Sequence, residues 1–307
     1  MTCLHATVLA ATPLLEVVDV HCTAPKSGWS AEECAHRPRL VLPRRGVFAW
    51  QTHDETYLAE AGCLLNFAPD HGYRFSHPTD GGDDCMLIAV AAETWDQVVN
   101  LRALRRCAYL QPPRHYEGAL LYQAAARHGR DDALLLEEVS VPLIERFVDL
   151  LTRVSRPRSV GKPRAFANHR RLVEAARTYV SANFCARDDL GDIARQLYSS
   201  PFHLARVFRA HMGITLHRYR NDLRLAAALR ALEEGCEDLA GLALRLGYAS
   251  HAHFSTAFRA AFGSSPSAAR EVLTRATLNE LRRILQAHVT DRRRSPVIPV
   301  EGKVPKE

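Results

Sequence analysis

Apolar residues change their spacing along the chain. Between residues 16 and 92, short apolar or alternating runs recur at 40–42, 46–51, 56–59, 63–67, 73–77 and 85–90. Turn formers separate these runs, among them Pro43, Gly62 and the segment 78–84 with its two glycines. Alternation with a period of two is typical of half-buried strands, and many short strands at regular spacing favour a sandwich or a barrel. The sequence therefore predicts a β domain in this part of the chain.

Beyond residue 94 the apolar period becomes that of helices. Residues 95–104 and 119–126 form two short amphipathic segments. Residues 134–151 carry apolar side chains on a wide face, and Pro142 is expected to kink this helix. These helices are expected to pack against the β domain. The resemblance described below implies, as an alternative, that they pair with their counterparts in a second protomer.

Two segments nearer the C-terminus repeat one pattern. Residues 190–213 and 239–263 each contain an apolar stripe at i, i+3 and i+7, a break, and a second stripe. In the first break Ser200 precedes Pro201, which suits an N-cap followed by the first helical position. The second break begins with Gly247, a residue type that tolerates the positive φ of a sharp turn. Each copy thus predicts two helices joined by a tight turn.

The second helix of each copy is amphipathic. Leu204 and Phe208, or Phe254 and Phe258, fall at i and i+4 on its inner face, while its outer face is polar. This is a helix-turn-helix, in which the first helix braces the second and the second enters the DNA major groove. Residues 215–234 contain neither Pro nor Gly and predict a connecting helix about 30 Å long. Two recognition helices held at this spacing could enter two successive major grooves on one side of the duplex, which lie about 34 Å apart.

Charge is divided unevenly between the two halves of the chain. Residues 1–151 carry 13 Lys and Arg against 20 Asp and Glu, a net charge of −7. Residues 152–307 carry 27 against 14, a net charge of +13. A basic half that also holds two helix-turn-helix patterns points to double-stranded DNA as the partner, ahead of RNA or a membrane surface.

Residues 168–270 resemble the AraC/XylS DNA-binding domain, the bipartite helix-turn-helix of bacterial transcription regulators. In the first copy and the connector the resemblance rests on Ile193, Ala194, Ser200, Pro201, Phe202, His203, Leu204, Arg206, Phe208, Arg224 and Leu225. In the second copy and just after it the residues are Gly247, Tyr248, Phe254, Phe258, Arg259, Phe262, Gly263, Ser265, Pro266 and Arg270. Tyr198 stands where the family usually has the turn glycine, so the first turn is expected to be strained or differently wound.

The outer faces of the two second helices supply the expected DNA contacts. Arg206 lies two residues past the buried Leu204, where a guanidinium can bridge O6 and N7 of a guanine. The resemblance implies that Phe202 faces the groove beside it. The expected base-reading residues are Phe202, Arg206, Ser250, His251, His253 and Thr256, and the expected backbone contacts are His203, Arg209, Ser255 and Arg259.

The N-terminal domain resembles a cupin, a small jelly-roll barrel, through residues 62–69 followed by Gly72. Metal-binding cupins have a close His pair and a Glu on one strand and a His later, whereas this chain has Cys34-Ala35-His36 and then Tyr73. The resemblance therefore implies a small-molecule pocket without a metal. The expected lining is Phe48, Trp50, Phe67, His71, Tyr73 and Arg74, although the aromatic members also suit a plain core.

The eight cysteines include no CxxC pair, so reduced thiols are expected. His21-Cys22, Cys34 with His36, and Cys63 would form a metal or redox site only if the fold brought them together, so no metal or cofactor is assigned. No apolar run reaches about 18 residues, and the N-terminus lacks a signal-peptide pattern. The expected location is the cytoplasm, with no membrane partner.

Together these patterns predict an α+β protein of two domains, a cupin-like β-barrel with flanking helices and an all-α bipartite helix-turn-helix. The expected divisions are 1–152 for effector sensing and dimerisation, 153–167 for a linker, 168–270 for DNA binding, 271–290 for a further helix and 291–307 for a disordered tail. The predicted function is sequence-specific transcription regulation and not enzymatic. By resemblance the protein is an activator that contacts RNA polymerase, binds a small-molecule effector and forms a homodimer. Two alternatives stay open, a metal-dependent cupin enzyme with a DNA-binding tail and an effector-independent DNA-binding protein.

Overall fold

The computed structural model describes residues 4–53, 55–100, 102–129, 131–152 and 163–292. The N-terminal part contains the strands β1 (Leu4–Ala11), β2 (Leu15–Cys22), β3 (Glu33–Cys34), β4 (Arg39–Thr52), β5 (Thr56–Glu60), β6 (Cys63–Phe67), β7 (Gly72–Ser76), β8 (Asp83–Val90) and β9 (Cys107–Tyr109) and the helices α1 (Ala92–Val99), α2 (Pro112–His128) and α3 (Ala133–Thr152). The C-terminal part contains α4 (Pro163–Asn183), α5 (Leu190–Gln196), α6 (Pro201–Met212), α7 (Leu216–Glu233), α8 (Leu239–Arg245), α9 (His251–Phe262), α10 (Pro266–Thr274) and α11 (Leu278–Arg292). In the described ranges, no helix combines the length and apolar character needed to cross a membrane.

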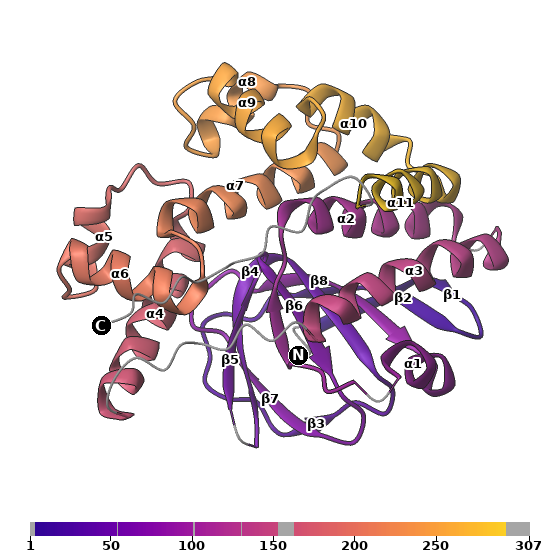
Figure 1. Cartoon of the computed structure of the whole chain (residues 1–307), viewed down its shortest axis with the longest axis horizontal. Coiled ribbons are helices and arrows are strands. Elements are labelled where there is room, and N and C mark those ends of the chain that lie inside the picture. The colour runs from indigo at the N-terminus through magenta and orange to yellow at the C-terminus, as the bar shows by residue number, and fades with distance from the viewer. Residues whose placement is uncertain (1–3, 54, 101, 130, 153–162, 293–307) are drawn as a thin grey trace, which may run out of the picture.

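The strands form an antiparallel sheet around the long strand β4. Its order is β1-β2-β8-β4-β6-β9, while β5 and β7 pair with the second half of β4 and β3 pairs with β7. Among the described residues this order does not return on itself, so the closed barrel expected from the sequence is not observed. Figure 1 shows the resulting curved sheet below the helices.

Strand β4 is continuous where the sequence predicted a turn. Pro43 lies inside the strand, and the register to β8 shifts between Pro43 and Arg45. Proline has no N–H to donate, and a bulge is one of the few places in a sheet that accepts it. The neighbouring Gly46 has φ +78°, and an added Cβ would lie 2.1 Å from the carbonyl oxygen of Gly82. The bend of β4 therefore requires a glycine at this position.

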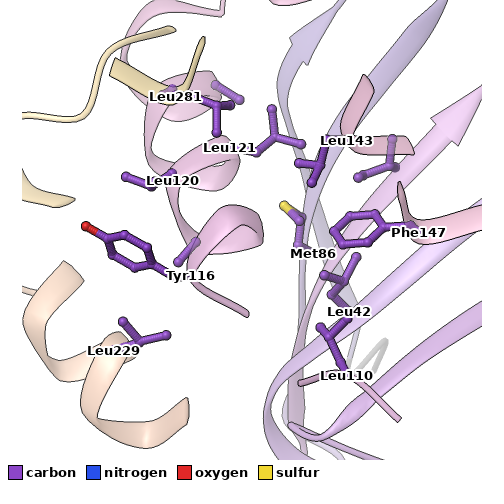
Figure 2. Packing of buried hydrophobic residues seen from close by; sticks show 14 of the residues in the cluster. Leu42, Met86, Leu110, Tyr116, Leu120, Leu121, Leu143, Phe147, Leu229 and Leu281 are labelled. Carbon is purple, nitrogen blue, oxygen red and sulfur yellow. The ribbon is translucent and has the colours of Figure 1, made fainter. Parts of the chain in front are cut away.

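Two apolar layers lie on opposite faces of the sheet. On one face Trp50 stacks on Phe67 with ring centroids 4.4 Å apart, and Tyr73 packs edge-on against Phe67 at 4.9 Å. On the other face Met86 and Phe147 belong to a core formed by the sheet, α2 and α3 (Figure 2). That core continues into the C-terminal part of the chain through leucines of α7 and α11, so α2 is enclosed between the sheet and the helical domain.

Helix α11 joins the C-terminal end of the chain to the N-terminal domain. It packs against α2 and α3, and Arg146 of α3 donates a hydrogen bond of 2.7 Å to the carbonyl oxygen of Leu285. The sequence predicted one helix over 271–290, but the chain breaks after Thr274 and restarts at Leu278. Thr277 caps the new helix by accepting from the N–H of Glu280 at 3.2 Å.

The linker and tail boundaries are only partly covered. Helix α4 already begins at Pro163, so residues 163–167 of the predicted linker are helical. The remaining linker residues, 153–162, and residues 293–307 of the predicted tail lie outside the described residues.

Candidate nucleic-acid interface

The first helix-turn-helix unit consists of α5 and α6, with α4 packed behind α6. Asp189 caps α5 through a reciprocal pair of bonds with Asp192, and Ser200 caps α6 by accepting from the N–H of His203 at 3.2 Å. The apolar residues of α6 point inward, since Leu204 and Phe208 are fully buried. The Ser200 cap predicted from the sequence thus starts α6, Asp189 starts α5, and burial fixes which face of α6 is outward.

The turn of this unit contains Tyr198 in the left-handed region, with φ +51°. Its counterpart in the second unit, Gly247, has φ +80°. The two turns therefore wind in the same sense, and the strain expected from the sequence resides in the backbone of Tyr198. Its ring is fully exposed, so no packing offsets the cost of about 1–2 kcal/mol for a residue with a Cβ in this conformation.

The second unit consists of α8 and α9 and repeats these devices. Asp238 caps α8 by accepting from the N–H of Gly241 at 2.8 Å, and Ser250 caps α9 by accepting from His253 at 3.1 Å. Phe254 and Phe258 are fully buried on the inner face of α9. On the outer face His251, Thr256 and Arg259 are exposed, and His253 lies against the ring of Tyr248.

Helix α7 holds the two units apart, as Figure 1 shows. Its 18 residues span about 27 Å. Arg224 of α7 donates to the carbonyl oxygens of Phe184 at 2.7 Å and Ala186 at 2.9 Å, and its guanidinium lies over the ring of Tyr248. Arg224, one of the residues on which the family resemblance rests, therefore connects the segment after α4 to the turn of the second unit.

The residues predicted to contact DNA gather on the two outer faces. Phe202 is 79% exposed, which is unusual for so large an apolar side chain and fits a contact surface. His203 and Ser255 are partly buried, and the former lies beside the ring of His169. The remaining predicted contacts are all exposed: Arg206, Arg209, Ser250, His251, His253, Thr256 and Arg259. Their roles on DNA stay predictions.

The predicted effector-pocket residues fall into two groups. Phe48, Trp50, Phe67 and Tyr73 are buried and pack in one cluster, as in a plain core. His71 and Arg74 are exposed. The pocket over these six residues stays a prediction.

A cavity of about 270 Å³ lies instead between the two domains. Its lining comes from β2, β4, β8 and α2 on one side and α7 on the other, and consists of Asp19, His21, Arg44, Asp84, Tyr122, Gln123, Arg230, Glu233 and Glu234. Asp84 pairs with Arg230 of α7, and Glu233 of α7 pairs with Arg44. No local sequence pattern could reveal this site, because each pair joins residues more than a hundred positions apart.

Electrostatics in this cavity favour the ion pairs. Burial disfavours the charge on Asp84, but hydrogen bonds from Arg45, Arg230 and His21 outweigh it and hold the pKa of that carboxyl well below its ordinary value. Burial raises the pKa of Glu233, and the nearby Arg44 opposes the rise. Asp84 is therefore ionised at neutral pH and attracts α7 to the sheet.

Further polar contacts tie α4 and α7 to the sheet. Arg177 of α4 donates to both carboxylate oxygens of Glu60 at 2.6 Å and to the carbonyl oxygen of Leu58 at 2.8 Å. The hydroxyl of Tyr109 donates to Asp222 of α7 at 2.7 Å. The supporting helices α4 and α7 are thus both bonded to the N-terminal domain.

Comparisons with known proteins agree on the helical region. A helix-turn-helix domain family matches residues 193–272. The transcriptional activator RhaS of Pectobacterium atrosepticum is 34% identical over 104 residues, which cover 34% of this chain and 37% of RhaS. The bifunctional transcriptional activator/DNA repair enzyme AdaA of Bacillus subtilis is 29% identical over 100 residues, 33% of this chain and 47% of AdaA. The matched region thus spans less than half of either relative.

Among solved structures, ToxT of Vibrio cholerae aligns over 88% of this chain and 99% of its own, with 12% identity and a TM-score of 0.35. The cupin resemblance and the homodimer stay predictions. Since the two capped units lie in the region that the helix-turn-helix family matches, residues 193–272 form a helix-turn-helix domain.

Proposed function

We propose that the chain is a sequence-specific DNA-binding transcription regulator that reads DNA with α6 and α9. The observation that carries the proposal is the duplication: two capped units, each with a buried inner face and an exposed outer face, at the two ends of α7. The length of α7, about 27 Å, is close to the roughly 34 Å between successive major-groove faces.

In the proposed complex the residues of the two outer faces have different roles, some contacting bases and others contacting phosphates. Arg206 reads a guanine and Phe202 contacts a thymine methyl, because both side chains are exposed on the N-terminal half of α6. Arg209 and Arg259 neutralise phosphates, since each lies in the last turn of its helix. Ser250, the N-cap of α9, and Thr256 within α9 have shorter side chains and should discriminate less strongly between bases.

We also propose that the N-terminal domain controls these units through the contacts between domains. A ligand shifts an equilibrium only if it binds one arrangement better than the other. A ligand in the cavity between Asp84 and Arg230 would contact both domains and compete with their ion pair. Activation, contact with RNA polymerase and a homodimer are carried over from the resemblance.

Fluorescence anisotropy with the full-length protein tests the proposal. DNA from upstream of its own and neighbouring genes is compared with scrambled duplexes at two salt concentrations. A preference of about a thousandfold for one segment is expected of a specific regulator. Equal and steeply salt-dependent binding to every duplex would leave only contacts to phosphates and would refute sequence-specific reading.

A further inference from the structure

Three metal-binding side chains, Cys22, His77 and Asp83, meet at one end of the N-terminal sheet, and Cys85 lies beside them. Cys22 ends β2 and Asp83 begins β8, and the register places these two residues directly opposite one another. Cys85 follows Asp83 by two positions and therefore lies on the same face of β8. His77 comes directly after β7 and is held by a bridge to Ser27. The sheet thus brings together residues that the sequence keeps far apart.

Their ligand atoms are close to the spacing of a metal site. Nε2 of His77 lies 2.8 Å from Oδ1 of Asp83 and 3.6 Å from Sγ of Cys22. One ligand atom from each of Cys22, His77 and Asp83 lies within 4.8 Å of the other two. Sγ of Cys85 lies 3.3 Å from Oδ2 of the same carboxylate, outside this group of three. Zinc bonds of 2.0–2.3 Å in a tetrahedron place ligand atoms about 3.5 Å apart. Small side-chain movements would therefore suffice to centre an ion between them.

The surroundings also favour an ion. All four side chains are buried, with 4–8% of each residue exposed. A buried carboxylate needs a compensating charge. The adjacent Asp84 pairs with two arginines, whereas Asp83 lies against the imidazole of His77. The other ring nitrogen of His77, Nδ1, lies 3.4 Å from the hydroxyl of Ser27. A metal-bound histidine commonly makes such a contact, which orients its ring.

We propose that Cys22, His77 and Asp83 bind a zinc ion and that Cys85 becomes the fourth ligand after a rotation of its side chain. Thiolate and imidazole ligands suit zinc, whereas calcium and magnesium prefer all-oxygen sites. Four protein ligands leave no open position, so the site is structural. It fastens the loops 23–27 and 78–82 to the ends of β2 and β8. Asp84, the next residue on β8, points to the opposite face and reaches Arg230, so the ion supports the strand that holds the domain contact.

Metal analysis of the full-length protein tests the site. Protein produced with added zinc and passed through a desalting column is expected to retain about one zinc ion per chain. Cys22→Ala and His77→Ala should lose it. Cys34→Ser is the matched control, because Cys34 is exposed on β3 and does not belong to the cluster, and it should keep the ion. Ser27→Ala, which removes only the hydroxyl near His77, should weaken zinc affinity about 10–100-fold.

Cobalt substitution keeps the test independent of variants that fail to fold. Wild-type protein freed of metal with a chelator is titrated with Co²⁺, and thiolate ligation produces a sulfur-to-cobalt charge-transfer band in the near ultraviolet. Zinc should abolish this band by displacement. Wild-type protein without retained zinc and without the band would overturn the proposal. Loss of zinc from Cys34→Ser to the same extent as from Cys22→Ala would overturn it as well.

Discussion

The turn glycine of the second unit offers a sharp test, because a matched glycine lies at the other end of the same helix. Gly247 precedes α9 with φ +80°, and Gly263 follows it with φ +75°. Replacing either by alanine adds a Cβ in the left-handed region at a cost of about 1–2 kcal/mol. The backbone term is therefore nearly equal in the two variants.

Their surroundings differ. A Cβ on Gly263 meets no atom within 4 Å. A Cβ on Gly247 would lie 2.3 Å from the carbonyl oxygen of Cys185 and 2.6 Å from Nη2 of Arg224. Arg224 would have to move, and it would lose at least one of its two hydrogen bonds to carbonyl oxygens. A hydrogen bond to a charged group contributes about 1.5–3 kcal/mol. Gly247→Ala should therefore destabilise α9 by about 2–3 kcal/mol more than Gly263→Ala.

Hydrogen exchange measured by mass spectrometry reports this difference locally, without requiring the whole chain to unfold in one step. Amides of α9 should exchange about 30 to 150 times faster in Gly247→Ala than in Gly263→Ala, since 1.4 kcal/mol corresponds to a factor of ten. Tyr198→Gly should change the exchange rate in the opposite direction, because it relieves backbone strain in the equivalent turn of the first unit. Amides of α6 should therefore exchange more slowly in this variant. Equal exchange rates in the two alanine variants would refute the steric reasoning.

Three further predictions follow from other contacts. In anisotropy titrations, Arg206→Ala should weaken binding to the preferred DNA by about 1–3 kcal/mol and reduce the base preference at one position, whereas Arg209→Ala should weaken binding to all duplexes equally. An equal loss of affinity for all duplexes in Arg206→Ala would contradict base reading. Arg177→Met leaves Glu60 buried without its cation and should lower stability to urea by about 3–5 kcal/mol, and Arg177→Met/Glu60→Leu should recover most of it. Burial lowers the pKa of His115 from 6.5 to about 4. As the pH falls through this range, the unfolded chain takes up a proton at His115 before the folded chain does, so the free energy of unfolding should decrease by at most about 3 kcal/mol between pH 6.5 and 4. In His115→Gln the urea unfolding midpoint should vary less with pH across this range. The same pH dependence in the variant and the wild type would contradict the lowered pKa of His115.

Some features of the fold were readable because they depend on neighbouring residues. Ser200 before Pro201 and Ser265 before Pro266 start helices in the structure, and Gly263 ends one. Each cap involves residues within about three positions, so its chemistry is visible in the sequence. The outward position of Arg206 followed in the same way from the period of α6.

Other features were read wrongly or missed. The sequence predicts a turn at Pro43, whereas in the structure a bulge in β4 accommodates this proline. The break before α11 was missed although Thr277 and Glu280 have the spacing of a helix start. β1 and β2 both lie before the first expected run at 40–42, and the pairing of β1 with β2 and of β2 with β8 becomes evident only in the sheet.

The sequence by itself determined the double helix-turn-helix, because helix periodicity, caps and turn glycines act within one or two turns of chain. Only the tertiary structure decided where the cavity, the domain contacts and the proposed zinc site lie. Cys22 and His77 are 55 positions apart, and Glu60 and Arg177 are 117 positions apart. Strand register and the docking of α4, α7 and α11 bring such residues together. These depend on the free energy of burying whole faces against one another, which no local pattern records.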